Sequence, residues 1–409
     1  MTRLDGKIKY QEAERAFAVR RLTPLDYMVI LLFLVIMPSA ILHSIIGIEN
    51  KIIFAFLVPP IIIATVWSRR WLRNASEGVT IFLLTMNGLL ASLVADSYSQ
   101  ALMGVTLSAS LLCGYQLMLT LRTNQALKIA SWVAFALLVG GVIGIIYSFL
   151  VREPLYEIKV EYRTSYLYLT TFSIAAIGDF VRPCGIFDEP GAFAMYVAII
   201  TMFNDTMRVN RHLNVVLVSL LVFTGSLVGI LLIALYFVTS NAMRAVRFAS
   251  IAVLFALTVS IGVADYIFPD NPLGKAVDTF YSERFQIVDG ALVGDNRSNQ
   301  VAEFFELVDA NIILRGQKAS GRDYYEQDQA ANPFSIVFGY GLIISLPYFL
   351  LVMWLLTITI RSGFRNSYAT LGLFVLLLQR PYIYHLSWSI MIAALVWLIY
   401  SSTARRRVC

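Results

Sequence analysis

The chain has 409 residues, of which 58% are hydrophobic and only 14% are charged, with a formal net charge of +6. Soluble domains carry about 25% charged residues, so this composition excludes an ordinary soluble globular protein and predicts a chain solvated largely by lipid. The basic residues lie between apolar runs, which is typical of membrane topology and gives no reason to expect nucleic acid as a partner.

Apolar runs recur along the chain at about the 20-residue length that a helix needs to cross the hydrocarbon core of a bilayer. They lack the period-two alternation of barrel strands, so we expect helices. The first run follows a basic stretch too long for a signal peptide and is predicted to be a retained first helix. The runs lie at 26–47, 52–67, 78–95, 98–120, 129–150, 190–204, 213–225, 226–240, 249–268, 333–360, 367–379 and 384–401.

Basic clusters separate alternate runs, and cytoplasmic loops of membrane proteins are enriched in Lys and Arg. Placing every cluster in the cytoplasm puts both termini inside and makes 151–189 and 268–332 two large periplasmic loops. The sequence therefore predicts one all-α polytopic membrane domain over 1–409. The clusters are the N-terminal stretch, Arg69 to Arg73, Arg122 with Lys128, Arg208 with Arg211, Arg244 with Arg247, Arg361 with Arg365, and Arg405 to Arg407.

The run 213–240 is too long for one untilted helix, and both of its flanks look cytoplasmic. It contains Phe223-Thr-Gly-Ser226 at its middle, so we expect two short helices that meet at this break, or a re-entrant pair. The run 367–379 is also short. Interrupted helices are tolerated in a membrane where they line protein or a watery cavity.

The stretch 182–194 contains two prolines and two glycines, which disfavour a regular helix until about residue 190. Asp188 and Glu189 precede Pro190, which suits the first position of a helix, so simple helix capping explains one acid. It does not explain Arg182, which lies at the expected outer boundary. An arginine and a carboxylate held on a rigid turn there suit a charged lipid head group.

Arg380 and His385 lie in an expected outer turn between the last two apolar runs. Tyr382 and Tyr384 flank them, so an aromatic belt with snorkelling anchors is an equal alternative. In the second large loop, Arg284 and Arg297 are weaker candidates for binding phosphate through their planar fork of donors. The chain has no GxxxxGK[ST] loop, HExxH motif or CxxC pair, so we expect no ATP bound by that loop and no metal site.

The pattern Arg182-x-x-Gly185-x-Phe187-x-Glu189-Pro190-x-x-Phe193-Ala194 resembles the signature of Wzy-type O-antigen and capsule polymerases. The break at 223–226 is similar to the Ser/Thr-Gly hinge of these polymerases and of O-antigen ligases, and 332–344 is similar to their helix after the second large loop. Ligase-like members often have a basic residue after the hinge. Leu227 and Val228 follow it here, which favours a polymerase.

The resemblance implies a GT-C-like glycosyltransferase of the bacterial inner membrane, with about twelve spans and its active face in the periplasm. It would join undecaprenyl-diphosphate-linked repeat units, donor to acceptor, without a cofactor or metal, because the lipid diphosphate is the leaving group. Membrane lipid and a chain-length regulator are the other partners expected.

Arginines are the groups expected to stabilise the departing diphosphate, and Arg182 and Arg380 are the first choices. Arg284 and Arg297 are the second choices. The base that removes a proton from the attacking sugar hydroxyl is expected to be Glu189, with His385 as runner-up. Alternatively, Glu189 only orients Arg182 through a salt bridge.

Three rival functions remain open from the sequence. A ligase would use the same donor with lipid A core as acceptor. A flippase for the lipid-linked unit would carry cationic residues in a mid-membrane cavity. A membrane scaffold without enzymatic activity would explain the topology but not the turn at 182–190.

Overall fold

The computed structural model of the chain describes residues 21–46, 55–56, 58–63, 75–151, 153–160, 163–177, 180–240, 287–288, 291–292, 309–317, 333–362 and 367–408. The expected helix at 249–268, half of the expected helix at 52–67 and most of the second large loop lie outside these residues. The predictions for Arg284 and Arg297 lie outside them too.

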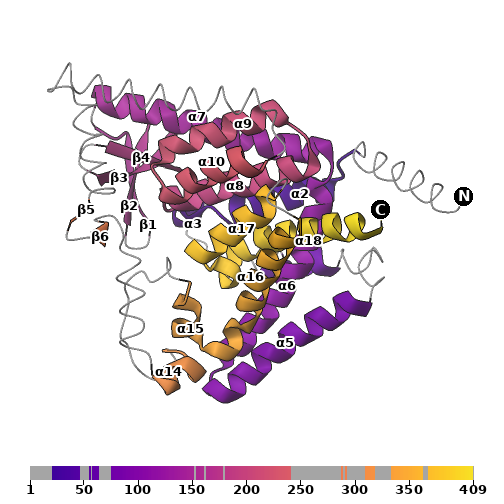
Figure 1. The fold of residues 1–409 in the computed structure, drawn as a ribbon. Coiled ribbons are helices and arrows are strands. Elements are labelled where there is room, and N and C mark those ends of the chain that lie inside the picture. The colour runs from indigo at the N-terminus through magenta and orange to yellow at the C-terminus, as the bar shows by residue number, and fades with distance from the viewer. Residues whose placement is uncertain are drawn as a thin grey trace, which may run out of the picture.

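The described part of the chain is mostly helical, and the helices pack around one another in a bundle (Figure 1). Among the described residues, four helices are long and apolar enough to cross a membrane: α5 (Ala75–Ala95), α6 (Tyr98–Leu121), α7 (Asn124–Val151) and α16 (Leu342–Ser362). On α5, large apolar side chains such as Leu93 and Phe82 are exposed, as lipid-facing residues are. The expectation of a helical membrane protein is confirmed at this level.

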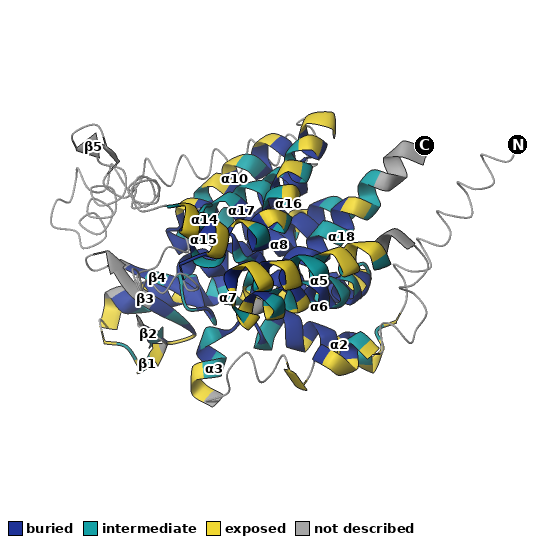
Figure 2. Cartoon of the chain, turned by 90° about the horizontal axis from the view of Figure 1, so that it is seen from below, coloured by how far each residue is buried: buried dark blue, intermediate teal, exposed yellow. Residues whose placement is uncertain are grey.

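Helix α8 (Pro190–Met207) is the central element, and all of its residues up to Asp205 are buried. It contacts α7, α17 (Tyr368–Gln379) and α18 (Leu386–Val408), and Figure 2 shows its dark blue ribbon inside the bundle. An apolar helix that is buried on every side belongs to the interior of a large bundle. The predicted helix start at residue 190 is confirmed.

The break predicted in the run 213–240 is present. Helix α9 (Arg211–Leu220) is followed by a 3₁₀ turn, η2 (Leu221–Thr224), and the chain then continues as α10 (Leu227–Thr239). Gly225 ends η2 with a φ of 56°, a left-handed conformation that glycine adopts at little cost. The polar break therefore separates two short helices, as expected.

Two other runs are divided in a way that the sequence analysis did not predict. The first run forms α2 (Pro24–Ile30), the π-helical η1 (Leu31–Ile36) and α3 (Ala40–Ile46), because Pro38 lacks the N–H that a continuous helix needs. The run 333–360 forms α15 (Ser335–Tyr340) and α16, separated by Gly341 with a φ of 87°. Neither run is a single helix.

The region 151–189, expected to be a large periplasmic loop, holds a four-stranded antiparallel sheet in the order β1-β2-β3-β4. Its strands are β1 (Tyr156–Val160), β2 (Arg163–Tyr168), β3 (Thr171–Ile177) and β4 (Phe180–Gly185). The sequence analysis did not predict this sheet. It forms because aromatic and β-branched residues favour strands and each strand follows the last through a short connection.

The sheet packs against α7, which is glycine-rich where they meet. A Cβ atom on Gly141 would come within 2.8 Å of the Pro183 side chain, and one on Gly144 within 3.0 Å of the Tyr168 carbonyl oxygen. The glycines therefore let the sheet approach the helix closely and fix the position of β4, which leads into α8. The remaining short elements among the described residues are β5 (Ile287–Val288), β6 (Ala291–Leu292), α14 (Ala310–Arg315) and η5 (Tyr382–Tyr384).

Candidate functional site

A buried ion pair joins the start of α8 to the end of α17. The guanidinium Nη1 of Arg380 contacts the carboxylate Oε1 of Glu189, and the two side chains are only 10% and 15% exposed. Breaking a buried pair by removing one partner typically costs about 3–5 kcal/mol, because a desolvated charge is left alone. The pair thus brings together two of the residues selected from the sequence, 191 positions apart.

Glu189 reaches Arg380 because the chain leaves the sheet in a fixed conformation. Gly185 has a φ of 67°, and Phe187 then stacks between Phe193 and Trp388, with ring centroids 5.6 Å and 5.8 Å away. Glu189 occupies the N-cap of α8 in extended conformation, yet its side chain makes no capping hydrogen bond. Helix capping, the simpler explanation of this acid, is therefore not how its side chain is used.

The Arg380 side chain lies against the first turn of α8. A Cβ atom on Gly191 would collide with Nη2 of Arg380, so the guanidinium occupies the space that only glycine leaves. Nη1 also donates a hydrogen bond of 2.7 Å to the Tyr382 hydroxyl. Nε is buried and has no hydrogen-bond partner among the described residues. An arginine in this state keeps part of its donor capacity for a ligand.

Arg182 lies at the same end of the bundle but contacts a different element. Its Nε donates a hydrogen bond of 3.3 Å to the carbonyl oxygen of Thr224, in the break between α9 and α10. Thr224 in turn lies beside α10, with its Oγ1 3.2 Å from a Cβ placed on Gly229, and Ala194 of α8 is 3.7 Å from the same point. Arg182 therefore connects β4 to the polar break next to α8.

His385 follows η5 and is exposed, with its ring 5.4 Å from the ring of Tyr382. The atoms packed around the imidazole disfavour its charged form and lower the pKa of His385, which the nearby Asp188 carboxylate opposes. A positive charge on His43 of α3 would lower this pKa further. Asp188 and His43 are therefore close enough to His385 to act on its charge.

The sequence analysis did not select His43 as a functional residue. Its Nε2 is buried without a hydrogen-bond partner among the described residues. Helix α3 is held against the turn by a hydrogen bond of 2.8 Å from the Ser39 hydroxyl to the Ile186 carbonyl oxygen. Only the break in the first apolar run at Pro38 could have indicated that α3 lies against residues 184–186.

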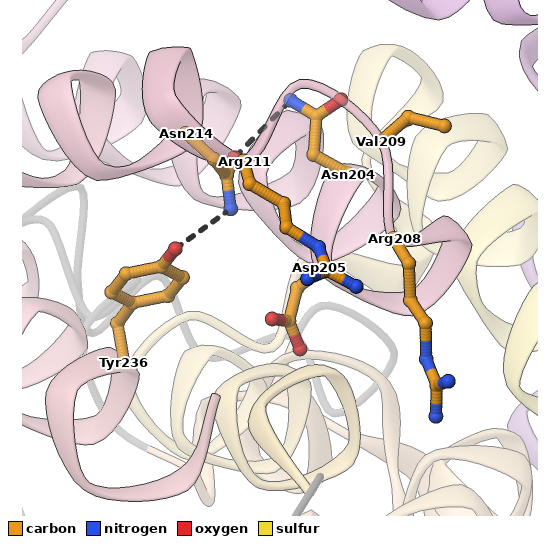
Figure 3. Close-up of a pocket in the computed structure, with 7 residues that line it drawn as sticks. All are labelled: Asn204, Asp205, Arg208, Val209, Arg211, Asn214 and Tyr236. Carbon is orange, nitrogen blue, oxygen red and sulfur yellow. Dashed lines mark hydrogen bonds between the residues drawn. The ribbon is translucent and has the colours of Figure 1, made fainter. Parts of the chain in front are cut away.

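A second polar cluster surrounds a small hollow at the other end of α8 (Figure 3). The side-chain amide of Asn204 donates to Asn214 Oδ1 at 3.1 Å and to the Ser131 hydroxyl at 2.9 Å. Asn214 donates to the Tyr236 hydroxyl at 3.4 Å. These groups satisfy one another, so the cluster ties α7, α8, α9 and α10 together and is a less promising ligand site than Arg380.

No family model, curated protein or solved structure matches this chain.

Proposed function

We propose that the chain is a membrane glycosyltransferase that polymerises undecaprenyl-diphosphate-linked repeat units into O-antigen or capsular polysaccharide. The observation that carries the proposal is the buried Arg380, paired with Glu189 at the start of α8 and with its Nε unpartnered among the described residues. Because the resemblance to Wzy-type polymerases rests on the same 182–194 stretch that forms this turn, sequence and geometry support one site.

In this proposal Arg380 stabilises the negative charge that develops on the departing diphosphate. Glu189 holds the guanidinium in position, and its carboxylate is thereby a poorer base than the sequence analysis expected. His385, whose pKa is lowered, is the better candidate to accept the proton of the attacking sugar hydroxyl. Arg182 positions β4 against the break at Thr224.

The proposal includes the finer topology. The chain would have about twelve spans with a GT-C-like arrangement, both termini in the cytoplasm of a bacterium, and the Arg380 site at the periplasmic surface of the inner membrane. A chain-length regulator would be its protein partner.

The proposal predicts that Arg380→Ala abolishes long-chain polymer while the protein still inserts in the membrane. Arg380→Lys keeps the charge but loses the planar fork, so we expect a loss of about 10²–10³-fold in rate, as for removal of one stabilising donor in other enzymes. The measurement is joining of purified lipid-linked repeat units by the full chain in lipid bilayers, read as glycan length on a gel.

Arg315→Lys is the matched control, because Arg315 ends the short helix α14 and was assigned no role. Normal polymer from Arg380→Ala would refute the site. Transfer of finished polymer to lipid A core by the wild-type chain, without elongation, would instead identify a ligase.

A further inference from the structure

We infer that the first turn of α8 and Arg380 form one diphosphate-binding site, in which the backbone amides of Gly191 and Ala192 bind phosphate oxygens beside the guanidinium. The inference rests on the proposed function for the identity of the ligand. It adds that the helix itself is part of the site and that Gly191 is the residue that makes the shared site possible.

The two edges of the Arg380 guanidinium have different surroundings. The Nη1 side faces Glu189 and the Tyr382 hydroxyl. The other edge, formed by Nε and Nη2, has two parallel donors and can bind two oxygens of a phosphate at once. Nε has no partner among the described residues, and Nη2 lies over Gly191. The ligand-binding edge of the arginine is therefore next to the start of the helix.

The start of α8 also offers donors of its own. The first N–H groups of a helix have no carbonyl within the helix to bond, and an acid or hydroxyl at the N-cap usually satisfies them. Glu189 is at the N-cap but is turned to Arg380 and makes no capping hydrogen bond. Pro190 has no N–H, so Gly191 and Ala192 supply the first amides of this 18-residue helix.

The positive charges at this site favour an anion that carries more than one negative charge. The helix contributes about half a positive charge at this end, and phosphate binds at helix N-termini for this reason. The Glu189 carboxylate balances Arg380 and keeps the guanidinium in position. A diphosphate brings two phosphate groups, one for the Nε–Nη2 edge and one for the amides, whereas a monophosphate cannot span both.

Gly191 is essential to this arrangement because a side chain at this position would displace the guanidinium. A Cβ would strike the Arg380 guanidinium, and the Arg380 side chain is only 10% exposed and so cannot move away into open solvent. Gly191→Ala should therefore separate the guanidinium from the helix end while leaving both charges in the chain.

The sequence allows the Gly191 amide to be observed alone, because Pro190–Gly191 is the only Pro–Gly pair in the chain. Full-length protein with ¹³C-carbonyl proline and ¹⁵N-glycine, in lipid nanodiscs, gives one amide signal selected by coupling across this peptide bond. We expect farnesyl diphosphate to shift the Gly191 amide proton downfield, and farnesyl monophosphate to bind at least tenfold more weakly.

Two variants complete the experiment. Gly191→Ala should weaken farnesyl diphosphate binding at least tenfold, whereas Gly339→Ala, where an added Cβ meets no atom within 4 Å, should change it by less than twofold. The labelled wild-type protein carries the test even if Gly191→Ala does not fold. Inorganic pyrophosphate is the third ligand, and weaker binding of pyrophosphate than of farnesyl diphosphate would assign the site to a lipid carrier.

An unshifted Gly191 amide at saturating farnesyl diphosphate would overturn the role of the helix end, and equal affinity for the monophosphate would overturn the assignment to a diphosphate. If the amide shifts but the chain joins no repeat units, the binding site stands and the proposed polymerase does not.

Discussion

The backbone of Glu189 marks a helix start, but its side chain does not cap the helix. An acid before Pro190 is typical of a helix start, and the backbone of Glu189 does occupy the N-cap. The side chain instead pairs with Arg380, which the sequence analysis had placed in the same site without predicting the contact. A pair between residues 189 and 380 depends on tertiary packing of α8 against α17 and α18, which no local pattern contains.

Replacement of Glu189 distinguishes two roles for this residue, which are orienting Arg380 and acting as the general base. Glu189→Gln keeps an oxygen acceptor for Arg380 and removes the charge, so we expect polymerisation within about tenfold of wild type if Glu189 orients the arginine. Removal of a general base typically costs 10²–10⁴-fold in rate. The measurement is the rate of joining purified lipid-linked units in bilayers.

Glu189→Ala provides the corresponding stability test. It leaves Arg380 buried without its carboxylate, and we expect unfolding to become easier by about 3–5 kcal/mol. Thermal unfolding in detergent measures this, with Glu157→Ala on the exposed strand β1 as the control expected to change little.

The activity test with Glu189→Gln has its own contradicting outcome. A loss of activity in Glu189→Gln as large as that in Arg380→Ala would show that the carboxylate is the base.

Among the elements, the sequence predicted helices well where long apolar runs lie between basic clusters, as in α5, α6 and α7. It failed where a single backbone residue decides the outcome, such as Pro38 in the first run or Gly341 before α16. It also missed the sheet at 156–185, because short strands next to membrane helices carry a much weaker pattern than a 20-residue apolar run. The polar break at 223–226 was predictable since it interrupts an otherwise continuous run.

Helices α5 and α6 pack closely together, which the sequence analysis did not predict. A Cβ atom on Gly88 would come within 2.7 Å of the Gly104 Cα, and the reverse contact is the same. Small residues let membrane helices approach closely and pack by van der Waals contact. The Thr85 and Ser108 hydroxyls hydrogen-bond at 3.0 Å across the same interface.

We predict that Gly88→Ala destabilises the chain by about 1–3 kcal/mol, the usual effect of overpacking, because backbone atoms on both sides cannot give way. Gly78→Ala on the same helix is the matched control: an added Cβ there meets no atom within 4 Å, so stability should be unchanged or slightly increased. Thermal unfolding in detergent compares the two. Equal melting temperatures would show that α5 and α6 do not pack this closely.

For the whole molecule, α8 separates two polar ends of different character. Its N-terminal end carries the Arg380–Glu189 pair, and its C-terminal end carries the Asn204 cluster with Arg208 and Arg211 beside it. Its 18 residues span about 27 Å, close to the thickness of the hydrocarbon core. The two ends are therefore expected at opposite membrane surfaces, with the two arginines in the cytoplasm.

Cysteine labelling tests this orientation in whole cells. Cys113 and Cys184 are buried, so a Cys409→Ser background should react little with a membrane-impermeant maleimide. In that background we expect Glu157→Cys, on the exposed strand β1, to react from outside, and Arg208→Cys, in the turn after α8, to react only after permeabilisation. Both positions are exposed, so a difference between them reports sidedness and not burial. Labelling of Arg208→Cys from outside, with Glu157→Cys protected, would place the Arg380 site in the cytoplasm, where the donor for a periplasmic polymerase is absent.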